Sequence, residues 1–137
     1  MVSRFDNQDI DMDEIISENP NDKAKGVLWV GNYHSAQNLE LLKQNQIRYV
    51  VTCMSIDTCK ELTTILKQNH IVQKIFESED NEECNLQKHF EDSYEFINKN
   101  LKFGNVLIHC FMGVSRAGAI ATAYLIKKYK ITYDNAL

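Results

Sequence analysis

The sequence predicts an α/β fold in which helices flank a central, mostly parallel sheet of about five strands. One observation is that stretches with strand composition alternate with stretches of helical periodicity from residue 27 onward. A second is the unbroken apolar run at residues 106–108, which is typical of a strand buried on both faces. The length of 137 residues suits one domain with one core. Ligands are expected where strands turn into helices.

The amino-terminal part is predicted to form a tail and a hairpin. Residues 1–11 are acidic and show no periodic pattern, so we expect a flexible tail before a domain at residues 12–137. Residues 12–16 are predicted to form a short edge strand, and residues 27–30 a second strand. Between them, residues 17–22 are a dense cluster of turn formers that includes the only proline.

Two helices and two strands are predicted to follow in alternation. Ser35 is expected to cap the first helix and Asp57 the second, because both side chains can accept hydrogen bonds from the N–H groups of a first helical turn. Residues 47–53 and 71–76 are the predicted strands. The expected core-facing side chains of the helices are Ala36, Leu39 and Leu42 in the first and Leu62, Ile65 and Leu66 in the second.

The clearest helix in the sequence covers residues 86–101, where apolar side chains recur every three or four positions. The buried strand at 106–108 follows it through Gly104 and Asn105. An apolar helix is predicted at 117–129, and residues 132–137 resemble the first turns of a further helix. The apolar stripe of the 86–101 helix consists of Leu86, Phe90, Tyr94, Ile97 and Leu101.

The charge balance argues against a nucleic-acid partner. The chain has 15 Lys and Arg against 19 Asp and Glu, a sequence pI near 5.5 and no basic run. A sequence-independent grip on phosphates requires clustered basic side chains. We therefore expect no nucleic-acid partner.

The cysteines and the apolar stretches predict a soluble, intracellular protein with reduced thiols. The four cysteines form no C-x-x-C pair and no Cys/His spacing typical of zinc, so neither a metal site nor a disulfide framework is expected. The amino terminus lacks an apolar signal region, and the longest nearly apolar stretch, residues 117–126, is too short to cross a bilayer. We expect no membrane partner and a cytoplasmic location, with the nucleus also open.

An anion-binding loop is predicted directly after the buried strand. If residues 111–115 curl into a loop, their N–H groups and the positive end of the next helix would converge on one point, which suits a phosphate. Gly113 permits a left-handed backbone, and the planar guanidinium of Arg116 can bind two phosphate oxygens. The whole segment reads His109, Cys110, Phe111, Met112, Gly113, Val114, Ser115 and Arg116.

Cys110 is the candidate nucleophile of this segment. A helix N-terminus and a nearby cation stabilise the thiolate, which is the reactive form of cysteine. A buried cysteine at a strand end is by itself more often a packing residue. The presence of His109, Gly113 and Arg116 at fixed positions around Cys110 favours the catalytic interpretation.

The pattern His-Cys-x-x-Gly-x-Ser-Arg at residues 109–116 resembles the active-site loop of the cysteine-dependent protein phosphatases, and its surroundings resemble their dual-specificity branch. The resemblance extends over about residues 12–137. It implies a phosphatase-like α/β fold with the phosphate loop between the last strand and a buried helix, and a domain that is short at its carboxyl end. Supporting segments, in family order, are residues 28–31, 35–38, 47–51, 80, 85–86, 90, 96–97, 106–110 and 123–125.

The resemblance also implies a mechanism without a cofactor. Cys110 would attack phosphorus, and water would hydrolyse the resulting phosphocysteine, while Arg116 and the amides of the loop hold the phosphoryl oxygens. Alignment to Asn85 and Leu86 places the family's general acid at Asp80, and Glu79 is the main competitor for that role. Like charges around Asp80 are expected to favour its protonated form.

One position departs from the family pattern. Ala117 stands where the family usually has Ser or Thr, whose hydroxyl stabilises the departing thiolate during hydrolysis of the phosphoenzyme. We therefore expect a rapid burst of product followed by slower turnover. Ser115 could compensate, although bonding within the loop is its more common use.

The remaining reactive side chains have structural interpretations beside functional ones. His109 is expected to order the loop by hydrogen bonding rather than to act as the base. Cys84 could trap an oxidised Cys110 as a disulfide, although chance placement is the commoner explanation. Cys53 and Cys59 are interpreted as structural residues.

The function predicted from the sequence is hydrolysis of phosphomonoesters on proteins, at phosphotyrosine, at phosphoserine and phosphothreonine, or at all three. The expected partner is a phosphorylated protein substrate. Three alternatives stay open: a weakly catalytic module that binds phosphorylated residues, a phosphatase for a phosphoinositide or an RNA 5′ phosphate, and a sulfur-transfer or arsenate-reducing enzyme with a similar anion loop.

Overall fold

The computed structural model describes residues 12–15, 26–78, 86–111 and 113–136, with the backbone alone for residues 131–136. The predicted tail at residues 1–11 lies outside these ranges. In chain order the elements are β1 (Met12–Ile15), β2 (Leu28–Gly31), α1 (Tyr33–Gln37), α2 (Leu39–Gln44), β3 (Ile47–Cys53), α3 (Lys60–Gln68), β4 (Val72–Ile75), η1 (Leu86–His89), α4 (Phe90–Asn100), β5 (Asn105–Cys110) and α5 (Ser115–Ala136).

The strands form one five-stranded sheet in the order β1-β2-β5-β3-β4. Strands β2, β5, β3 and β4 are parallel to their neighbours, and β1 pairs antiparallel with β2. The prediction of a mostly parallel sheet of about five strands, opened by an antiparallel pair, is confirmed. Because β5 is the last strand in sequence and the middle strand in space, its carboxyl end lies at the centre of one edge of the sheet.

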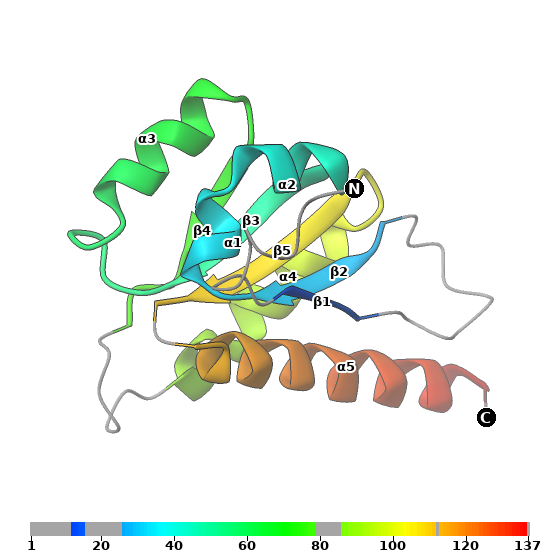
Figure 1. Ribbon diagram of the computed structural model, residues 1–137. Coiled ribbons are helices and arrows are strands. Elements are labelled where there is room, and N and C mark those ends of the chain that lie inside the picture. The colour runs from blue at the N-terminus through cyan, green and yellow to red at the C-terminus, as the bar shows by residue number, and fades with distance from the viewer. Residues whose placement is uncertain (1–11, 16–25, 79–85, 112, 137) are drawn as a thin grey trace.

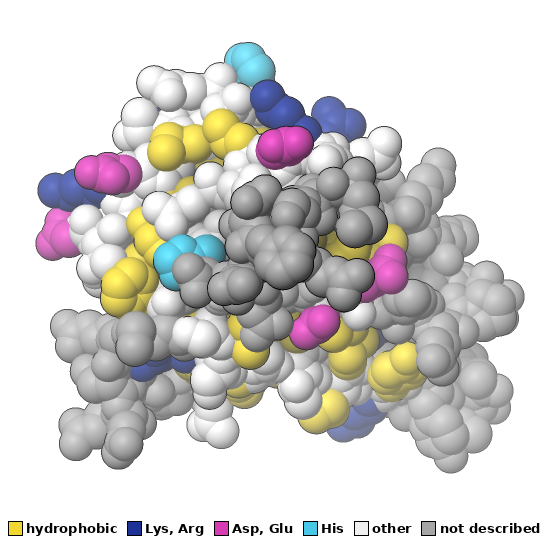
Figure 2. Space-filling view, in the orientation of Figure 1, with side chains coloured by type: hydrophobic (Ala, Val, Ile, Leu, Met, Phe, Trp, Pro, Cys, Tyr) yellow, Lys and Arg dark blue, Asp and Glu magenta, His cyan; other side chains and the backbone are white. Residues whose placement is uncertain are grey.

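Helices cover both faces of the sheet (Figure 1). The long α5 runs along one face beside α4, and α1, α2 and α3 cover the other face. The part of the chain that the structure describes contains no helix long and apolar enough to cross a membrane. Positive and negative side chains are interspersed over the described part of the face shown in Figure 2.

Alternation along the strands divides the buried side chains into two clusters. Val106, Ile108 and Cys110 of β5 pack into the cluster under α4 and α5, which also contains Ile97 and Ile120. Leu107, between them in sequence, packs into the other cluster with Leu42, Leu62 and Leu66 from α2 and α3. Since successive side chains of a strand point to opposite faces, the central strand contributes to both clusters.

The predicted caps of the first two helical segments are wrong. The segment after β2 forms two short helices, capped by Asn32 and Asn38, whose side chains accept hydrogen bonds from the N–H groups of Ser35 and Leu41, both at 3.0 Å. Ser35 is buried inside α1, where its hydroxyl donates to the Asn32 carbonyl at 2.7 Å. The two asparagines are the N-caps because each one directly precedes the first turn of a helix.

Asp57 also fails to cap its helix. Helix α3 starts three residues later than Asp57, at Lys60, and Cys59 precedes it without a side-chain cap. The Asp57 carboxylate is exposed and lies 3.4 Å from the Lys60 ammonium. Ser55 takes the capping role for the preceding turn, since its hydroxyl accepts from the Thr58 N–H at 3.2 Å.

Both α2 and α3 are followed by a residue in the left-handed region. Gln46 has φ 54° and His70 has φ 60°, and each lies two residues beyond the last residue of its helix. The N–H of Gln46 donates to the Lys43 carbonyl at 3.1 Å, and that of His70 to the Lys67 carbonyl at 3.2 Å. After each turn an isoleucine, Ile47 or Ile71, returns the chain to the buried cluster between sheet and helices.

The carboxyl-terminal end differs from the prediction. The helix predicted at 117–129 starts earlier, at Ser115, and continues to Ala136 without a break, so residues 132–136 belong to it instead of starting a further helix. The sequence after Gly118 contains neither proline nor glycine, so nothing in it stops the helix. The helix predicted at 86–101 is confirmed as η1 followed by α4.

Candidate active site

Cys110 is the last residue of the central strand. Its side chain is fully buried, and its Sγ–H donates to the Gly113 carbonyl at 3.5 Å. The sulfur therefore lies beneath the turn that follows the strand. The strand itself is held on both sides, since β5 pairs with β2 and with β3 along its length.

Residues 113 and 114 form a turn that leads into α5. Gly113 has φ 63°, a left-handed conformation that glycine permits, and a Cβ added there would meet no other atom within 4 Å. Helix α5 begins at Ser115, so Arg116 lies in its first turn, partly buried. Val114 accepts a hydrogen bond at its carbonyl from the Gly118 N–H at 2.7 Å. Met112 lies outside the described residues.

His109 is the buried anchor of this strand end. Its Nδ1 lies 3.3 Å from the Cys110 carbonyl, and its Nε2 lies 2.8 Å from the hydroxyl of Thr52 on β3. A carbonyl can only accept, so Nδ1–H donates to it, and a neutral ring then leaves Nε2 to accept from the Thr52 hydroxyl. Gln73 on β4 completes the chain, because its Nε2–H donates to the Thr52 oxygen at 2.8 Å.

The protonation of His109 agrees with this chain of hydrogen bonds. Burial lowers the pKa of His109 to about 4, and the hydrogen bond to the Cys110 carbonyl opposes that shift only partly. The imidazole is therefore neutral at physiological pH. A neutral ring that holds the carbonyl of the candidate nucleophile fits an ordering role and leaves no proton-accepting nitrogen facing the sulfur.

An aromatic side chain that the sequence did not single out lies beside the loop. The ring of Tyr33 is 5.4 Å from that of Phe111, edge to face, and 6.2 Å from that of His109. Phe111 is 40% exposed, so the two rings form part of the surface next to Cys110. Burial raises the pKa of Tyr33, with Glu61 adding to the shift, so its hydroxyl stays neutral.

The flanks of the segment that contains Asp80 lie at the same edge of the sheet as Cys110. Residues 79–85, with Asp80, Glu79 and Cys84, are outside the described residues. Before them, the Phe76 N–H donates to the Thr52 carbonyl at 2.8 Å. After them, the His89 ring lies 5.3 Å from the Phe76 ring, and its Nε2 is 3.2 Å from the Glu77 carbonyl. Both flanks are therefore fixed near Thr52, which pairs in register with His109.

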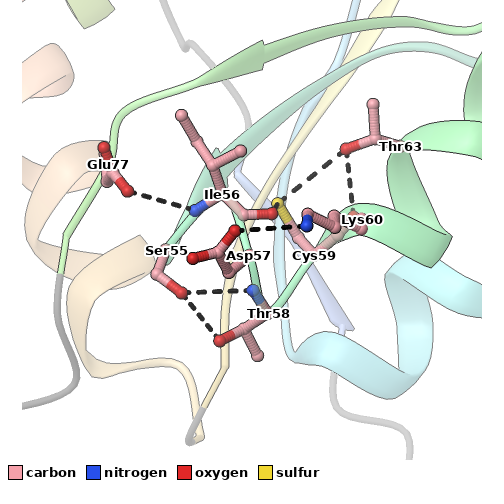
Figure 3. A network of polar contacts seen from close by, with 8 residues as sticks. All are labelled: Ser55, Ile56, Asp57, Thr58, Cys59, Lys60, Thr63 and Glu77. Carbon is pink, nitrogen blue, oxygen red and sulfur yellow. Dashed lines mark hydrogen bonds and ion pairs between the residues drawn. The ribbon is translucent and has the colours of Figure 1, made fainter.

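A polar network holds the neighbouring loop between β3 and α3 (Figure 3). The Ile56 N–H donates to the Glu77 carboxylate at 3.4 Å, which ties this loop to the chain just before residue 79. Within the loop, the Cys59 thiol donates to the Ile56 carbonyl at 3.6 Å. Burial raises the pKa of Cys59, so this thiol is stabilised in its protonated form.

Three residues of this region were not singled out by the sequence interpretation: Tyr33, Thr52 and Gln73. Thr52 was assigned to a buried strand, but which strand lies beside β3 depends on the order of strands in the sheet. A threonine at position 52, directly after Val50 and Val51 in a predicted buried strand, was the available signal, because a buried hydroxyl needs a hydrogen-bond partner.

Comparison with known proteins identifies a protein family that this chain matches. A family model described as the catalytic domain of dual specificity phosphatases matches residues 28–137. Dual specificity protein phosphatase 1B of Arabidopsis thaliana is 32% identical over 111 residues, which cover 80% of this chain and 63% of that protein. Dual specificity protein phosphatase 1 of the same plant is 32% identical over 114 residues, covering 80% of this chain and 53% of that protein. The chain thus spans less than two thirds of the length of these relatives.

Solved structures agree with the sequence relatives. The Yvh1 phosphatase domain from Chaetomium thermophilum matches with a TM-score of 0.65 and 25% identity, over 88% of this chain and 70% of that one. The structure of DUSP15 matches with a TM-score of 0.61 and 30% identity, over 72% of this chain and 60% of that one. A human tyrosine phosphatase-like serine/threonine/tyrosine-interacting protein matches with a TM-score of 0.59 and 25% identity, over 80% of this chain and 74% of that one.

Proposed function

This chain belongs to the dual-specificity phosphatase family, and from that premise we propose that it hydrolyses phosphomonoesters on proteins through a phosphocysteine intermediate. The observation that carries the proposal is the position of Cys110. It ends the central strand, immediately before a turn through Gly113 that leads into the N-terminus of α5 with Arg116 in its first turn. A helix N-terminus attracts anions, and an adjacent guanidinium adds directed donors.

In the proposed reaction, Cys110 attacks phosphorus in line with the ester oxygen. Arg116 and the N–H groups of residues 111–115 stabilise the negative charge on the equatorial oxygens. His109 acts as a positioning residue that holds the Cys110 carbonyl through its Nδ1–H. Water then hydrolyses the phosphocysteine and regenerates the thiolate.

We assign the proton for the leaving group to Asp80, whose segment is flanked by residues fixed beside Thr52. Asp80→Ala should slow release of a poor leaving group, such as an alkyl alcohol, by about 10² to 10⁴-fold. Release of a good leaving group, such as a nitrophenol, should change far less. Glu79→Ala is the matched control and should show no such dependence. Equal slowing of both substrates by Asp80→Ala would remove Asp80 from the role.

We expect hydrolysis of the phosphoenzyme to be the slow step, because Ala117 offers no hydroxyl to the departing thiolate. Ala117 is fully buried, in the first turns of α5. Rapid-mixing measurements should show a burst equal to the enzyme concentration, followed by slower turnover. Ala117→Ser should shorten the slow phase and shrink the burst. A linear time course for the natural chain at high enzyme concentration would contradict this expectation.

The substrate is proposed to be a phosphorylated protein. The decisive experiment compares the chain with Cys110→Ser on phosphotyrosine, phosphoserine and phosphothreonine peptides, an aryl phosphate, a phosphoinositide, a 5′-phosphorylated RNA and thiosulfate. Turnover of a peptide that Cys110→Ser abolishes, while the variant still binds that peptide, is the expected result. Peptide binding without turnover of even an aryl phosphate would replace the proposal by a binding module. Activity confined to lipid, RNA or thiosulfate would overturn the protein substrate.

A further inference from the structure

Two aromatic side chains lie in contact directly beside the candidate nucleophile. Phe111 follows Cys110 in the chain and is 40% exposed. Tyr33, at the start of α1, places its ring edge to face against Phe111, with 5.4 Å between the ring centroids. A single exposed ring is common on protein surfaces, but two rings in contact next to the reacting sulfur offer contact area to a substrate. Tyr33 and Phe111 therefore form an aromatic pair beside the site.

The backbone around the aromatic pair is tied to the sheet. Gly31, the last residue of β2, is the register partner of His109, and α1 begins two residues later at Tyr33. The Asn32 side chain caps this helix by accepting from the Ser35 N–H at 3.0 Å. The Tyr33 ring also lies 6.2 Å from the His109 ring. A surface held in this way loses little conformational freedom when a substrate binds.

A carboxylate lies next to the aromatic pair. Helix α1 packs against α3, whose first turn contains the exposed Glu61. The negative charge of Glu61 acts on Tyr33, since it adds to the rise that burial causes in the pKa of that residue. The neighbouring cation, Lys60, lies 3.4 Å from Asp57. An aromatic surface bordered by a carboxylate suits a side chain with an apolar stem and a positive end.

Two rings elsewhere in the described part of the chain hold a cation of the protein itself. The Lys127 ammonium lies 4.6 Å from the centre of the Tyr94 ring, and the Lys74 ammonium lies 5.8 Å from the centre of the Phe76 ring. Among the described residues, no lysine or arginine is placed in this way over the aromatic pair. Arginine fits this surface best, because its planar guanidinium stacks on a ring and also binds a carboxylate through two N–H groups.

We propose that the aromatic pair and Glu61 select phosphorylated proteins that carry an arginine one or two positions from the phosphorylated residue. This inference rests on the proposed function, because it names the substrate class of the same site. When the phosphoryl group lies beside Cys110 and Arg116, the neighbouring residues of the substrate pass over Phe111, since consecutive Cα atoms are about 3.8 Å apart. The guanidinium of the substrate then stacks on the aromatic pair, and its N–H groups donate to the Glu61 carboxylate.

The test compares phosphopeptides that differ at a single position. Two series are made, one on phosphotyrosine and one on phosphothreonine, in a fixed sequence of glycine, alanine and serine. The positions from two before to two after the phosphorylated residue carry arginine, lysine, leucine or glutamate in turn. At the preferred position we expect kcat/KM to be about 10-fold higher for arginine than for leucine, with lysine between them and glutamate lowest. If arginine is the preferred residue at none of these positions in either series, the inference is overturned.

Variants assign the preference to individual side chains. Tyr33→Leu and Glu61→Gln should each lower the ratio of kcat/KM for the arginine and leucine peptides by about 3- to 10-fold, whereas Tyr33→Phe, which keeps the ring, should retain it. A general loss of activity does not move this ratio. If Tyr33→Leu does not fold, Glu61→Gln, at an exposed position, decides alone. An unchanged ratio in either variant overturns the inference.

Matched controls remove similar groups elsewhere. Phe103→Leu removes an exposed ring at the other end of the sheet, before the first residue of β5, and Glu95→Gln removes an exposed carboxylate from α4, on the opposite face of the sheet from α3. Both variants should keep the ratio of the natural chain. A fall in this ratio in the controls equal to that in Glu61→Gln would overturn the assignment to the aromatic pair and Glu61.

Failure of this inference and failure of the proposed function give different results. Turnover of the peptides without a preference for arginine overturns the inference and leaves the phosphatase in place. Binding is measured separately, by fluorescence anisotropy of the same peptides, labelled, with Cys110→Ser. If arginine strengthens this binding while the natural chain releases no phosphate, the inference stands and the proposed function falls. Neither binding nor turnover of any of the peptides overturns both.

Discussion

At the scale of single residues, His109 is a titratable side chain that the fold removes from water. It is fully buried, and its two ring nitrogens bond to a carbonyl of its own strand and to a hydroxyl of the next. Those contacts suit the neutral ring. Burial of this ring therefore makes the stability of the fold sensitive to pH.

We predict that the stability of the fold falls in acid because of His109. Its pKa is lowered from 6.5 to about 4 in the folded chain, so the unfolded chain binds the extra proton first. The contribution is fully present above pH 6.5 and is lost as the pH falls toward 4, by up to about 3 kcal/mol. Urea unfolding at pH 7.5, 6.0 and 5.0 measures this change.

The variants assign that pH dependence to one residue. His109→Asn should lower the stability at neutral pH and flatten the dependence between pH 7.5 and pH 5.0. His34→Gln, on the exposed surface of α1, should keep the slope of the natural chain. An unchanged slope in His109→Asn would assign the effect to other groups.

Single residues also show how much of the candidate site could be predicted from the sequence. The segment 109–116 was identified because its chemistry depends on spacing along one chain, and the φ of 63° at Gly113 agrees with the turn expected there. Thr52 could not be identified, because its role arises from its register with His109 on another strand. The assignment of Asp80 as the general acid stays a prediction from alignment.

At the scale of elements, the ends of α2 and α3 store backbone strain. Gln46 and His70 occupy the left-handed region, where residues other than glycine are disfavoured. The strands were predictable, since unbroken apolar runs such as residues 106–108 have few other uses in a short domain. The helix starts were not, because several residues that can cap, such as Asn32, Ser35 and Asn38, stand within a few positions.

We predict that Gln46→Gly and His70→Gly each raise the free energy of unfolding by about 0.5 to 1 kcal/mol, since glycine adopts this conformation without a steric penalty. Thermal and urea unfolding measure the gain. Gln44→Gly and Gln68→Gly, at the last helical positions of α2 and α3, are the matched controls and should lower stability by up to about 1 kcal/mol. A loss of stability in the first pair would show that their side chains contribute more than the strain costs.

At the scale of the whole molecule, one strand joins two buried clusters. Leu107 faces the cluster of α1, α2 and α3, and Ile108 faces that of α4 and α5. We predict that the described domain unfolds in a single transition, because removing β5 from the sheet exposes both clusters. Leu107→Ala and Ile108→Ala should each lower the free energy of unfolding by about 2 to 5 kcal/mol.

Two probes check whether the clusters unfold together. Trp29, the only tryptophan, packs against the cluster of α1, α2 and α3, so its fluorescence reports on that side, while far-ultraviolet circular dichroism reports on all helices. Both probes should give the same urea midpoint in the natural chain and in both variants. A shift of the fluorescence midpoint alone in Leu107→Ala would show two separable halves.

His109 and Cys110 are consecutive residues of β5, a strand whose side chains alternate between the two faces of the sheet. The imidazole and the sulfur are adjacent along the chain, yet the two side chains lie on opposite faces of the sheet. Inserting or deleting one residue before them would exchange their sides, placing a thiol against Thr52 and an imidazole among hydrocarbons. The order of these two residues is therefore required by the alternation of the strand as well as by the proposed catalysis.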